Sequence, residues 1–447
     1  MTAQRLWQKD STPHAHLDRF TAGQDRVLDN QLARFDVLGS IAHATMLHRC
    51  GLLSGTEAEA ILRGLRTILA EVDAGTFTVA ADVEDIHSQV EITLTQRIGE
   101  AGKKLHTARS RNDQVLLDIK LYIRDRIAHT VAGLQGLFDR LLAASERYRS
   151  VAMPGYTHTQ IAMPSTFGLW FAAHAESLTD DLDQLLAAYR IADRNPLGSA
   201  AGFGSSFPID RQFTTELLGF SDLNVNVVYA QSTRGRTERA TLNALAAVAS
   251  SLGKLAADAV QYIGGEHGFL YLPDALTTGS SIMPHKKNPD GFELVRAHCN
   301  LLQGLPNTLA LVLANLTTGY HRDLQVTKEL LFPAFEKLDD CIAILGLMVD
   351  HLEMRREILA DPKYAHLFTV DAVHALVKQG VPFRDAYRQV GQAVADGSFR
   401  APEGEAHTHL GSAGDLRNDL IAERFARTRE AFACARAERA LAALERG

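Results

Sequence analysis

The chain contains only four cysteines among its 447 residues, Cys50, Cys299, Cys341 and Cys434, and no two of them stand in a CxxC spacing. This pattern indicates neither a disulfide framework nor a zinc site, and it favours a reducing compartment. The N-terminus lacks the apolar segment of a signal peptide, and no apolar run approaches the roughly 18 to 20 residues that span a bilayer. We therefore expect a soluble, cytoplasmic protein that binds no membrane.

An excess of positive charge is also absent, because the formal net charge is −7. A protein that binds nucleic acid through general phosphate attraction carries the opposite charge, so we expect no nucleic-acid partner. The sequence also holds no GxxxxGK[ST], GxGxxG or HExxH motif. Nucleotide-binding, dinucleotide-binding and zincin functions therefore lack support.

What the sequence does contain is long segments with apolar residues at helical spacing, whereas strand-like alternation is scarce. Each segment has about 30 residues, which corresponds to roughly 45 Å of helix. The segments lie at about 115–141, 166–194, 236–264, 290–317 and 328–355. We predict an all-α fold of three domains: an N-terminal helical domain (1–112), a central bundle of five long helices (113–357) and a small C-terminal domain (358–447).

The third long segment, ERATLNALAAVASSLGKLAADAVQYI, is apolar on nearly every face. Such a helix must be buried on all sides, and a single layer of five helices offers too few neighbours for that. We expect the bundle to pack against other copies of itself. A third packing layer within the chain is the alternative.

Residues 279–293, GSSIMPHKKNPDGFE, form a loop with glycines near both ends. Asn288, Pro289 and Asp290 read as a helix start, with Asn as the N-cap and Pro at the first helical position. Lys286 and Lys287 then stand just before the positive end of a helix dipole, which favours an anionic ligand. The alternative is a solvated linker with two surface lysines.

Two further polar segments precede long helices. In KKLHTARSRNDQ, residues 103–114, Arg109 and Arg111 flank Ser110, and Asn112 or Asp113 can cap the next helix, so guanidinium and backbone N–H groups can converge on a carboxylate. A well-capped surface turn is the alternative.

The second of these segments is MPGYTHTQIAMPST, residues 153–166, where a glycine turn presents Tyr156, Thr157 and His158. Imidazole moves a proton readily near neutral pH, although a lone histidine is more often structural. Together the three loops supply anchors for carboxylates, a histidine and a hydroxyl. These groups suit the removal of a proton next to a carboxylate and the stabilisation of the resulting carbanion.

These motifs resemble a known family. GSSIMPHKKNP resembles the signature loop of the fumarase/aspartase superfamily, and HTARSRNDQV with MPGYTH resembles its argininosuccinate lyase branch. EDIHSQVE at 84–91, YHRDLQVTKE at 320–329 and GVPFRDAY at 380–387 are similar as well, and the resemblance spans about residues 20–395. It implies a homotetramer that cleaves argininosuccinate to arginine and fumarate, in arginine biosynthesis, without a metal or other cofactor.

The resemblance also assigns roles to residues. Ser280 is expected to be the base that takes the Cβ proton, with its proton affinity set by Lys286 and nearby amides once the loop closes. Lys286 and Asn288 would hold the succinyl carboxylate, and His158, oriented by Glu293, would protonate the leaving guanidino nitrogen. Expected substrate-binding or nearby positions are His87, Ser110, Arg111, Asn112, Thr157, Tyr320, Gln325 and Lys328.

The chain departs from the family pattern in three places. Ala108 stands where glycine is usual, and Asp25 stands where many members have a substrate-binding serine. STRGRTER, residues 232–239, replaces a Ser-Asp/Glu-Arg-Asp segment, which leaves Arg234 or Arg236 as the arginine and removes at least one acid. Another lyase of the superfamily, acting on a related succinyl-amine, aspartate or malate, is therefore the nearest alternative.

Two other functions are open. HAHLD, residues 14–18, superficially matches an HxH metal pair of a hydrolase, but that motif belongs at the end of a barrel strand and nothing here predicts a barrel. Relatives of the family also serve as lens structural proteins. Retention of Ser280, His158 and Lys286 argues against a purely structural role.

The order of the motifs has a geometric consequence. RSRND opens the helix that begins near 113, and GYTH precedes the next long helix, which begins near 166. Consecutive bundle helices run antiparallel, so these two helix starts should lie at opposite ends of the bundle, roughly 45 Å apart. A complete site must then take its loops from several subunits.

The role of Ser280 can be tested by Ser280→Ala. This change should abolish turnover while leaving substrate affinity nearly intact, because the hydroxyl is needed in the transition state more than in the ground state. Steady-state kinetics and an equilibrium titration with argininosuccinate measure the two quantities. A kcat close to that of the unmodified chain would remove Ser280 from the mechanism.

Overall fold

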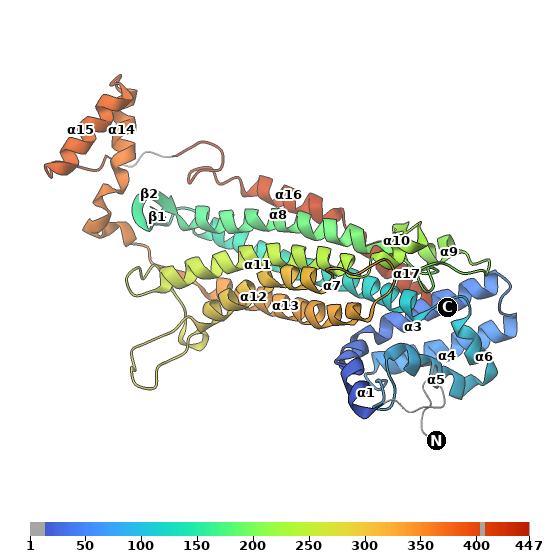
Figure 1. Cartoon of the computed structure of the whole chain (residues 1–447). Helices are drawn as coiled ribbons and strands as arrows, with labels where there is room; N and C mark the ends of the chain where they lie inside the picture. Colours follow the sequence, from blue (N-terminus) through green and yellow to red (C-terminus); the bar gives the residue numbers. More distant parts are fainter. Residues whose placement is uncertain (1–13, 403–406, 447) are drawn as a thin grey trace.

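The computed structural model describes residues 14–402 and 407–446, and helices dominate this part of the chain (Figure 1). The N-terminal region is built from short and medium helices around one end of a long bundle. They are α1 (Ala15–Ala22), α2 (Asp25–Leu28), η1 (Asp29–Leu32), α3 (Ala33–Arg49), α4 (Gly55–Asp73), α5 (Ile86–Ile98), α6 (Glu100–Lys103) and η2 (Lys104–His106). His14 is the exposed N-cap of α1 and accepts a hydrogen bond from the backbone of His16, so this motif opens a helix and lies on no barrel strand.

Five long helices form the central bundle, which confirms the predicted all-α architecture. They are α7 (Arg111–Arg147), α8 (Phe167–Ala192), α11 (Arg236–Ile263), α12 (Asp290–Val312) and α13 (Thr327–His351). Their apolar faces share one large core, in which α11 packs against α8, α12 and α13, and α7 packs against α8 and α13. The bundle is therefore the rigid body that positions every loop between the helices.

Two helix starts differ from the sequence prediction. The N-cap of α7 is Ser110, whose hydroxyl and the Asp113 carboxylate form a capping box, and neither Asn112 nor Asp113 is the cap. Helix α12 begins at Asp290, with Pro289 as its N-cap. Asn288 cannot cap it, because its backbone is paired with Thr278 in an isolated β-bridge that closes the loop between them.

The segment before α8 is a β-hairpin, which the sequence reading missed. Strand β1 (Ala152–Thr157) pairs antiparallel with β2 (Gln160–Thr166), and a bulge lies between Pro154 and Tyr156. The two turn residues, His158 and Thr159, have positive φ angles of 54° and 59°. The turn therefore presents the histidine at the tip of a two-stranded arm.

The remaining strands are two residues long and only tie neighbouring segments together. Strand β3 (Arg194–Asn195) pairs parallel with β4 (Asp222–Leu223), and β5 (Leu270–Tyr271) pairs antiparallel with β6 (Glu353–Met354). Short helices fill the connections: α9 (Arg211–Leu217), α10 (Val227–Ser232), η3 (Asp274–Leu276), η4 (Arg322–Val326), η5 (Ile358–Ala360) and η6 (Pro362–Phe368).

The C-terminal part of the chain lies at both ends of the bundle. Helices α14 (Thr369–Lys378) and α15 (Phe383–Ala395) have a small core of their own and project beyond the hairpin end (Figure 1). Helix α16 (Asn418–Glu430) then returns along α8, and α17 (Cys434–Arg446) contacts α3. The division into domains at residues 112 and 357 stays a prediction.

Helix α11 is the one helix in the described residues that is long and apolar enough to cross a bilayer. The expectation that no segment would be long and apolar enough to span a bilayer is therefore wrong when length and composition alone are considered. Its most apolar 18 residues are 56% buried inside the chain, as in the core helix of a bundle. The other residues of this stretch are partly or fully exposed in a single chain, which bears on how copies associate.

Candidate active site

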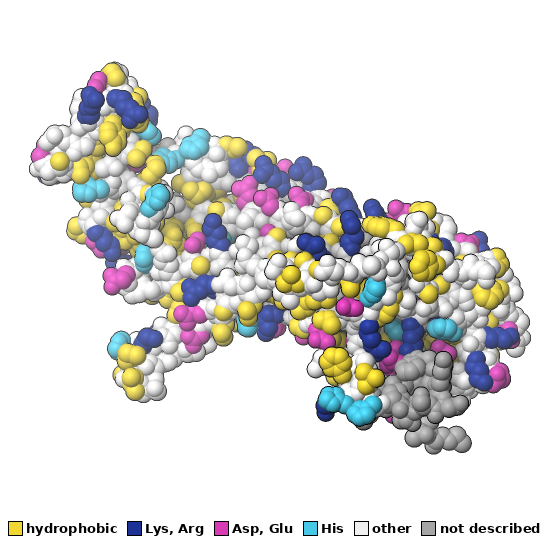
Figure 2. Space-filling view, viewed as in Figure 1, with side chains coloured by type: hydrophobic (Ala, Val, Ile, Leu, Met, Phe, Trp, Pro, Cys, Tyr) yellow, Lys and Arg dark blue, Asp and Glu magenta, His cyan; other side chains and the backbone are white. Residues whose placement is uncertain are grey.

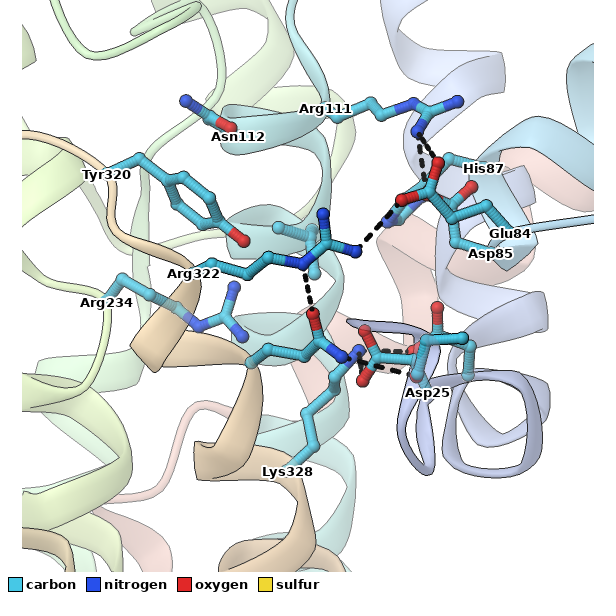
Figure 3. A pocket seen from close by; sticks show the side chains of 14 residues that line it. Asp25, Glu84, Asp85, His87, Arg111, Asn112, Arg234, Tyr320, Arg322 and Lys328 are labelled. Atoms are coloured by element: carbon cyan, nitrogen blue, oxygen red, sulfur yellow. Dashed lines mark hydrogen bonds and ion pairs between the residues drawn. The ribbon is translucent and has the colours of Figure 1, made fainter. Parts of the chain in front are cut away.

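A cavity of about 230 Å³ lies where the N-terminal helices meet the end of the bundle (Figure 3). It brings together six of the residues expected near the substrate: His87, Arg111, Asn112, Tyr320, Gln325 and Lys328. Most of its polar lining is charged, and these charges are supplied by segments that are far apart in the sequence. The cavity is therefore a site that folding assembles.

Arg111, the first residue of α7, is fixed by the acidic start of α5. Its Nη1 lies 3.2 Å from Glu84 Oε2 and 3.1 Å from Asp85 Oδ2, and its Nη2 donates to Ser88 Oγ at 2.6 Å. Asp85 is also the N-cap of α5 and accepts the backbone N–H of Ser88. Burial opposes the charged form of Asp85, but His87 and Arg111 outweigh burial and lower the pKa of its carboxyl.

Glu84 links Arg111 to a second cation. Its Oε1 lies 3.1 Å from Nη2 of Arg322, whose other contacts are the Thr21 carbonyl at 3.0 Å and the Gln325 side chain at 3.2 Å. The sequence reading did not single out Glu84 or Arg322, although both stand in motifs that carry the resemblance. One carboxylate thus holds two guanidinium groups at one wall of the cavity.

Lys328 lies between two carboxylates at the opposite wall. Its Nζ is 2.8 Å from Asp25 Oδ1 and 2.5 Å from Asp29 Oδ1, and its side chain is 3% exposed. Burial disfavours the ammonium ion, but Asp29 and Asp25 outweigh burial and raise the pKa of Lys328. Burial raises the pKa of Asp25 to about 6, although Lys328 opposes this shift.

His87 joins the cavity to a buried acidic cluster. Its Nδ1 lies 2.8 Å from Asp36 Oδ1 and 3.4 Å from Asp118 Oδ2. Burial disfavours the imidazolium, yet the charge and hydrogen bond of Asp36 raise the pKa of His87, while burial and Asp36 raise the pKa of Asp118 well above its usual range. These three residues are also the one group in the described chain with ligand atoms close enough to hold a metal, within 4.8 Å of one another. A proton held on His87 and one held on Asp118 also explain why these three side chains lie so close together without a metal.

The altered segment places Arg234, and not Arg236, at the cavity. Arg234 is buried, with Nε 2.9 Å from Glu238 Oε1 and Nη2 donating to the Leu324 carbonyl at 2.9 Å. Arg236 is exposed and does not line the cavity. Glu238 therefore supplies a buried acid one helical turn beyond Arg234.

The residues expected to carry out the reaction lie elsewhere. Thr157 and His158 are on the hairpin, Ser280, Lys286 and Asn288 are on the loop before α12, and Glu293 is on α12. Hairpin and loop both stand at the end of the bundle opposite to α1 and α5 (Figure 1). For the hairpin, this is the position that the antiparallel argument predicted. Ser110 does not line the cavity, because its side chain caps α7.

The loop before α12 is open to solvent. Ser280 Oγ accepts hydrogen bonds from the backbone of Met283 at 3.2 Å and of Ile282 at 3.4 Å, and Lys286 donates to the Asn288 side chain at 2.6 Å. The loop projects from the bundle and carries apolar as well as basic side chains (Figure 2), and Ile282 is 82% exposed. The backbone amides near Ser280 are in place, but the cavity lined by Arg111 and Lys328 lies at the other end of the bundle.

Comparison with known proteins identifies the chain. A model of a lyase family matches residues 14–304. The argininosuccinate lyase of Parabacteroides distasonis is 54% identical over 419 residues, which are 94% of each chain. The chain belongs to the argininosuccinate lyase family. This membership confirms the resemblance carried by the loop motifs.

Solved structures agree with the fold of the argininosuccinate lyase family. A crystal structure of EDDS lyase in complex with formate has a TM-score of 0.78 at 21% identity and covers 98% of this chain and 95% of that one. A class II fumarase from Schistosoma mansoni has a TM-score of 0.71 at 16% identity and covers 89% of this chain and 95% of that one. The fumarase/aspartase-like fold is thereby confirmed.

The raised pKa of Asp25 predicts a pH-dependent stability. An unfolded aspartate titrates near pH 4, and the folded carboxyl titrates near 6. Between these values the folded chain holds a proton that the unfolded chain lacks, so this group lowers the free energy of unfolding as pH rises from about 4 to about 6. Relative to the unmodified chain, Asp25→Asn should be similar at pH 4 and more stable by roughly 2 kcal/mol at pH 7.

Urea denaturation at the two pH values measures this difference. Asp82→Asn, at an exposed aspartate, is the matched control and should show no such change with pH. If Asp25→Asn loses stability relative to the unmodified chain as the pH rises, the contact with Lys328 outweighs burial and the argument is wrong.

Proposed function

We propose that the chain cleaves argininosuccinate to arginine and fumarate, at sites that each combine residues from different copies of a homotetramer. The observation that carries the proposal is the separation of the substrate-binding cavity from Ser280 and His158 in a chain 54% identical to an argininosuccinate lyase. The alternative, another lyase of the superfamily, is not favoured at this identity. The proposed location is the cytoplasm and the proposed role is arginine biosynthesis.

The chemistry follows from the groups that would meet at one site. Ser280 takes the proton from Cβ of the succinyl group, and the electrons form the double bond of fumarate as the bond from Cα to the guanidino nitrogen breaks. Lys286 and Asn288 stabilise the charge that builds on the succinyl carboxylate. His158 of the hairpin, oriented by Glu293 of α12, gives a proton to the leaving guanidino nitrogen, and arginine is released.

The cavity residues bind and orient the substrate. Arg111 and Arg322 are guanidinium groups held in place by Glu84, so they can meet a carboxylate without first ordering their side chains. Asp25 and Asp29 give the opposite wall a negative charge suited to an ammonium group. A zwitterionic amino-acid end matches this distribution of charge.

Association of copies is supported by uncovered apolar surface on two bundle helices. Leu294, Leu301 and Leu311 of α12 are 59%, 71% and 69% exposed, and Leu347 of α13 is 43% exposed. Monomeric soluble proteins rarely leave such rows uncovered, so they favour packing of the bundle against other copies. Copies packed with opposite orientation would bring hairpin and loop of neighbours over the cavity.

Shared sites predict that two inactive variants restore each other. Ser280→Ala and Arg111→Ala, refolded together, should regain activity, because some sites receive the loop from one chain and the cavity from another. With random assortment about a quarter of the sites are intact. Activity of the mixture relative to the unmodified chain, with mass spectrometry of the oligomers, measures the recovery.

A matched control uses two changes on one loop. Ser280→Ala and Lys286→Met lie on the same segment, so every site in their mixture keeps one defect and should stay inactive. If the first mixture stays inactive although mixed oligomers form, Ser280 and Arg111 act from the same chain.

A further inference from the structure

A second cavity, of about 320 Å³, lies behind Arg234 at the N-terminal end of α11. One wall consists of α10 and the start of α11, and the other is the segment 313–324, which runs from the end of α12 into η4. None of its lining residues is acidic, and three of them are arginines: Arg234, Arg236 and Arg239. The cavity is therefore electropositive.

Two of these arginines are available to a ligand. The Arg234 guanidinium already donates hydrogen bonds to Glu238 and to the Leu324 carbonyl. Arg236 and Arg239 are exposed, and within the described part of the chain the guanidinium group of neither one makes a hydrogen bond or an ion pair. They stand in the first turn of a 28-residue helix, whose dipole also attracts an anion.

An independent feature of the same cavity is Gln231 on α10. Its side chain lines the cavity and is 1% exposed, yet neither its amide nitrogen nor its amide oxygen has a hydrogen-bond partner among the described residues. A buried amide without partners is costly, and native structures rarely keep one unless a water or a ligand pairs with it. The amide N–H₂ can donate to an anion that also meets the arginines.

We propose that this cavity is a second binding site, for a small dianion, separate from the site where the substrate is cleaved. The chemistry that would recognise the ligand is two guanidinium groups, a helix N-terminus and an amide donor, which suit a phosphate group or a short dicarboxylate. Arg234, which Figure 3 shows at the first cavity, lines both cavities, so the occupant lies one side chain away from the proposed active site.

Calorimetric titration of the full-length protein tests the proposal, with inorganic phosphate and malonate as probes against chloride at the same ionic strength. We expect one dianion per chain, and the tighter probe identifies the chemical class. Arg236→Gln combined with Arg239→Gln should weaken binding about tenfold or more, the scale of losing charge-assisted hydrogen bonds. Arg190→Gln with Arg439→Gln, two exposed arginines elsewhere, removes the same charge and should leave binding unchanged.

Gln231→Leu tests the amide separately. It should weaken dianion binding and should not lower the Tm of the ligand-free protein, because it removes an unpaired buried group. A lower Tm with unchanged affinity would contradict the assigned role of Gln231.

The site itself is refuted if neither probe binds more tightly than chloride, or if the double arginine variant binds as well as the unmodified chain. Another outcome would also overturn the proposal: the unmodified chain binds no phosphate, and light scattering shows that the double arginine variant no longer forms the oligomer. The arginines would then contact a second copy.

Discussion

The rigidity of long helices is the constraint on which the rest of the structure depends. Helix α7 has 37 residues, and at 1.5 Å per residue it extends about 55 Å. The cavity forms around its first turn, whereas the hairpin with His158 follows its last. No side-chain movement closes such a distance, so under the proposed function the reacting groups at each cavity come from other copies of the chain. The exposed apolar rows of α12 and α13 are consistent with this proposal.

Within the cavity, the charges are fixed before a substrate arrives. Glu84 holds two guanidinium groups, and Lys328 is shared by Asp25 and Asp29. Ion pairs of this kind keep long side chains in one geometry in a partly buried site, where electrostatic interactions are stronger than in water. Asp25 bears part of the cost, because burial raises the pKa of its carboxyl to about 6. Binding of the substrate can then exchange internal ion pairs for new ones.

The sequence predicted most of the fold and about half of the proposed site. Helical periodicity is strong in the five long segments, so their number and order were right. The hairpin was missed because its turn residues, His158 and Thr159, adopt positive φ without the Asn-Gly signature of a two-residue turn. The cavity residues that stand in motifs of the argininosuccinate lyase family were predicted from the sequence. The ion pair between Glu84 and Arg322 was not, because it joins residues 238 positions apart and no local pattern can reveal such a contact.

The central claim, that one site draws on several copies, is tested most directly by a crystal structure of Ser280→Ala with argininosuccinate. The account predicts substrate density in the cavity of one copy, against Arg111 and Tyr320, with residue 280 and His158 contributed by other copies. Density for a substrate whose contacts with residues 111, 158 and 280 all come from a single chain would contradict it.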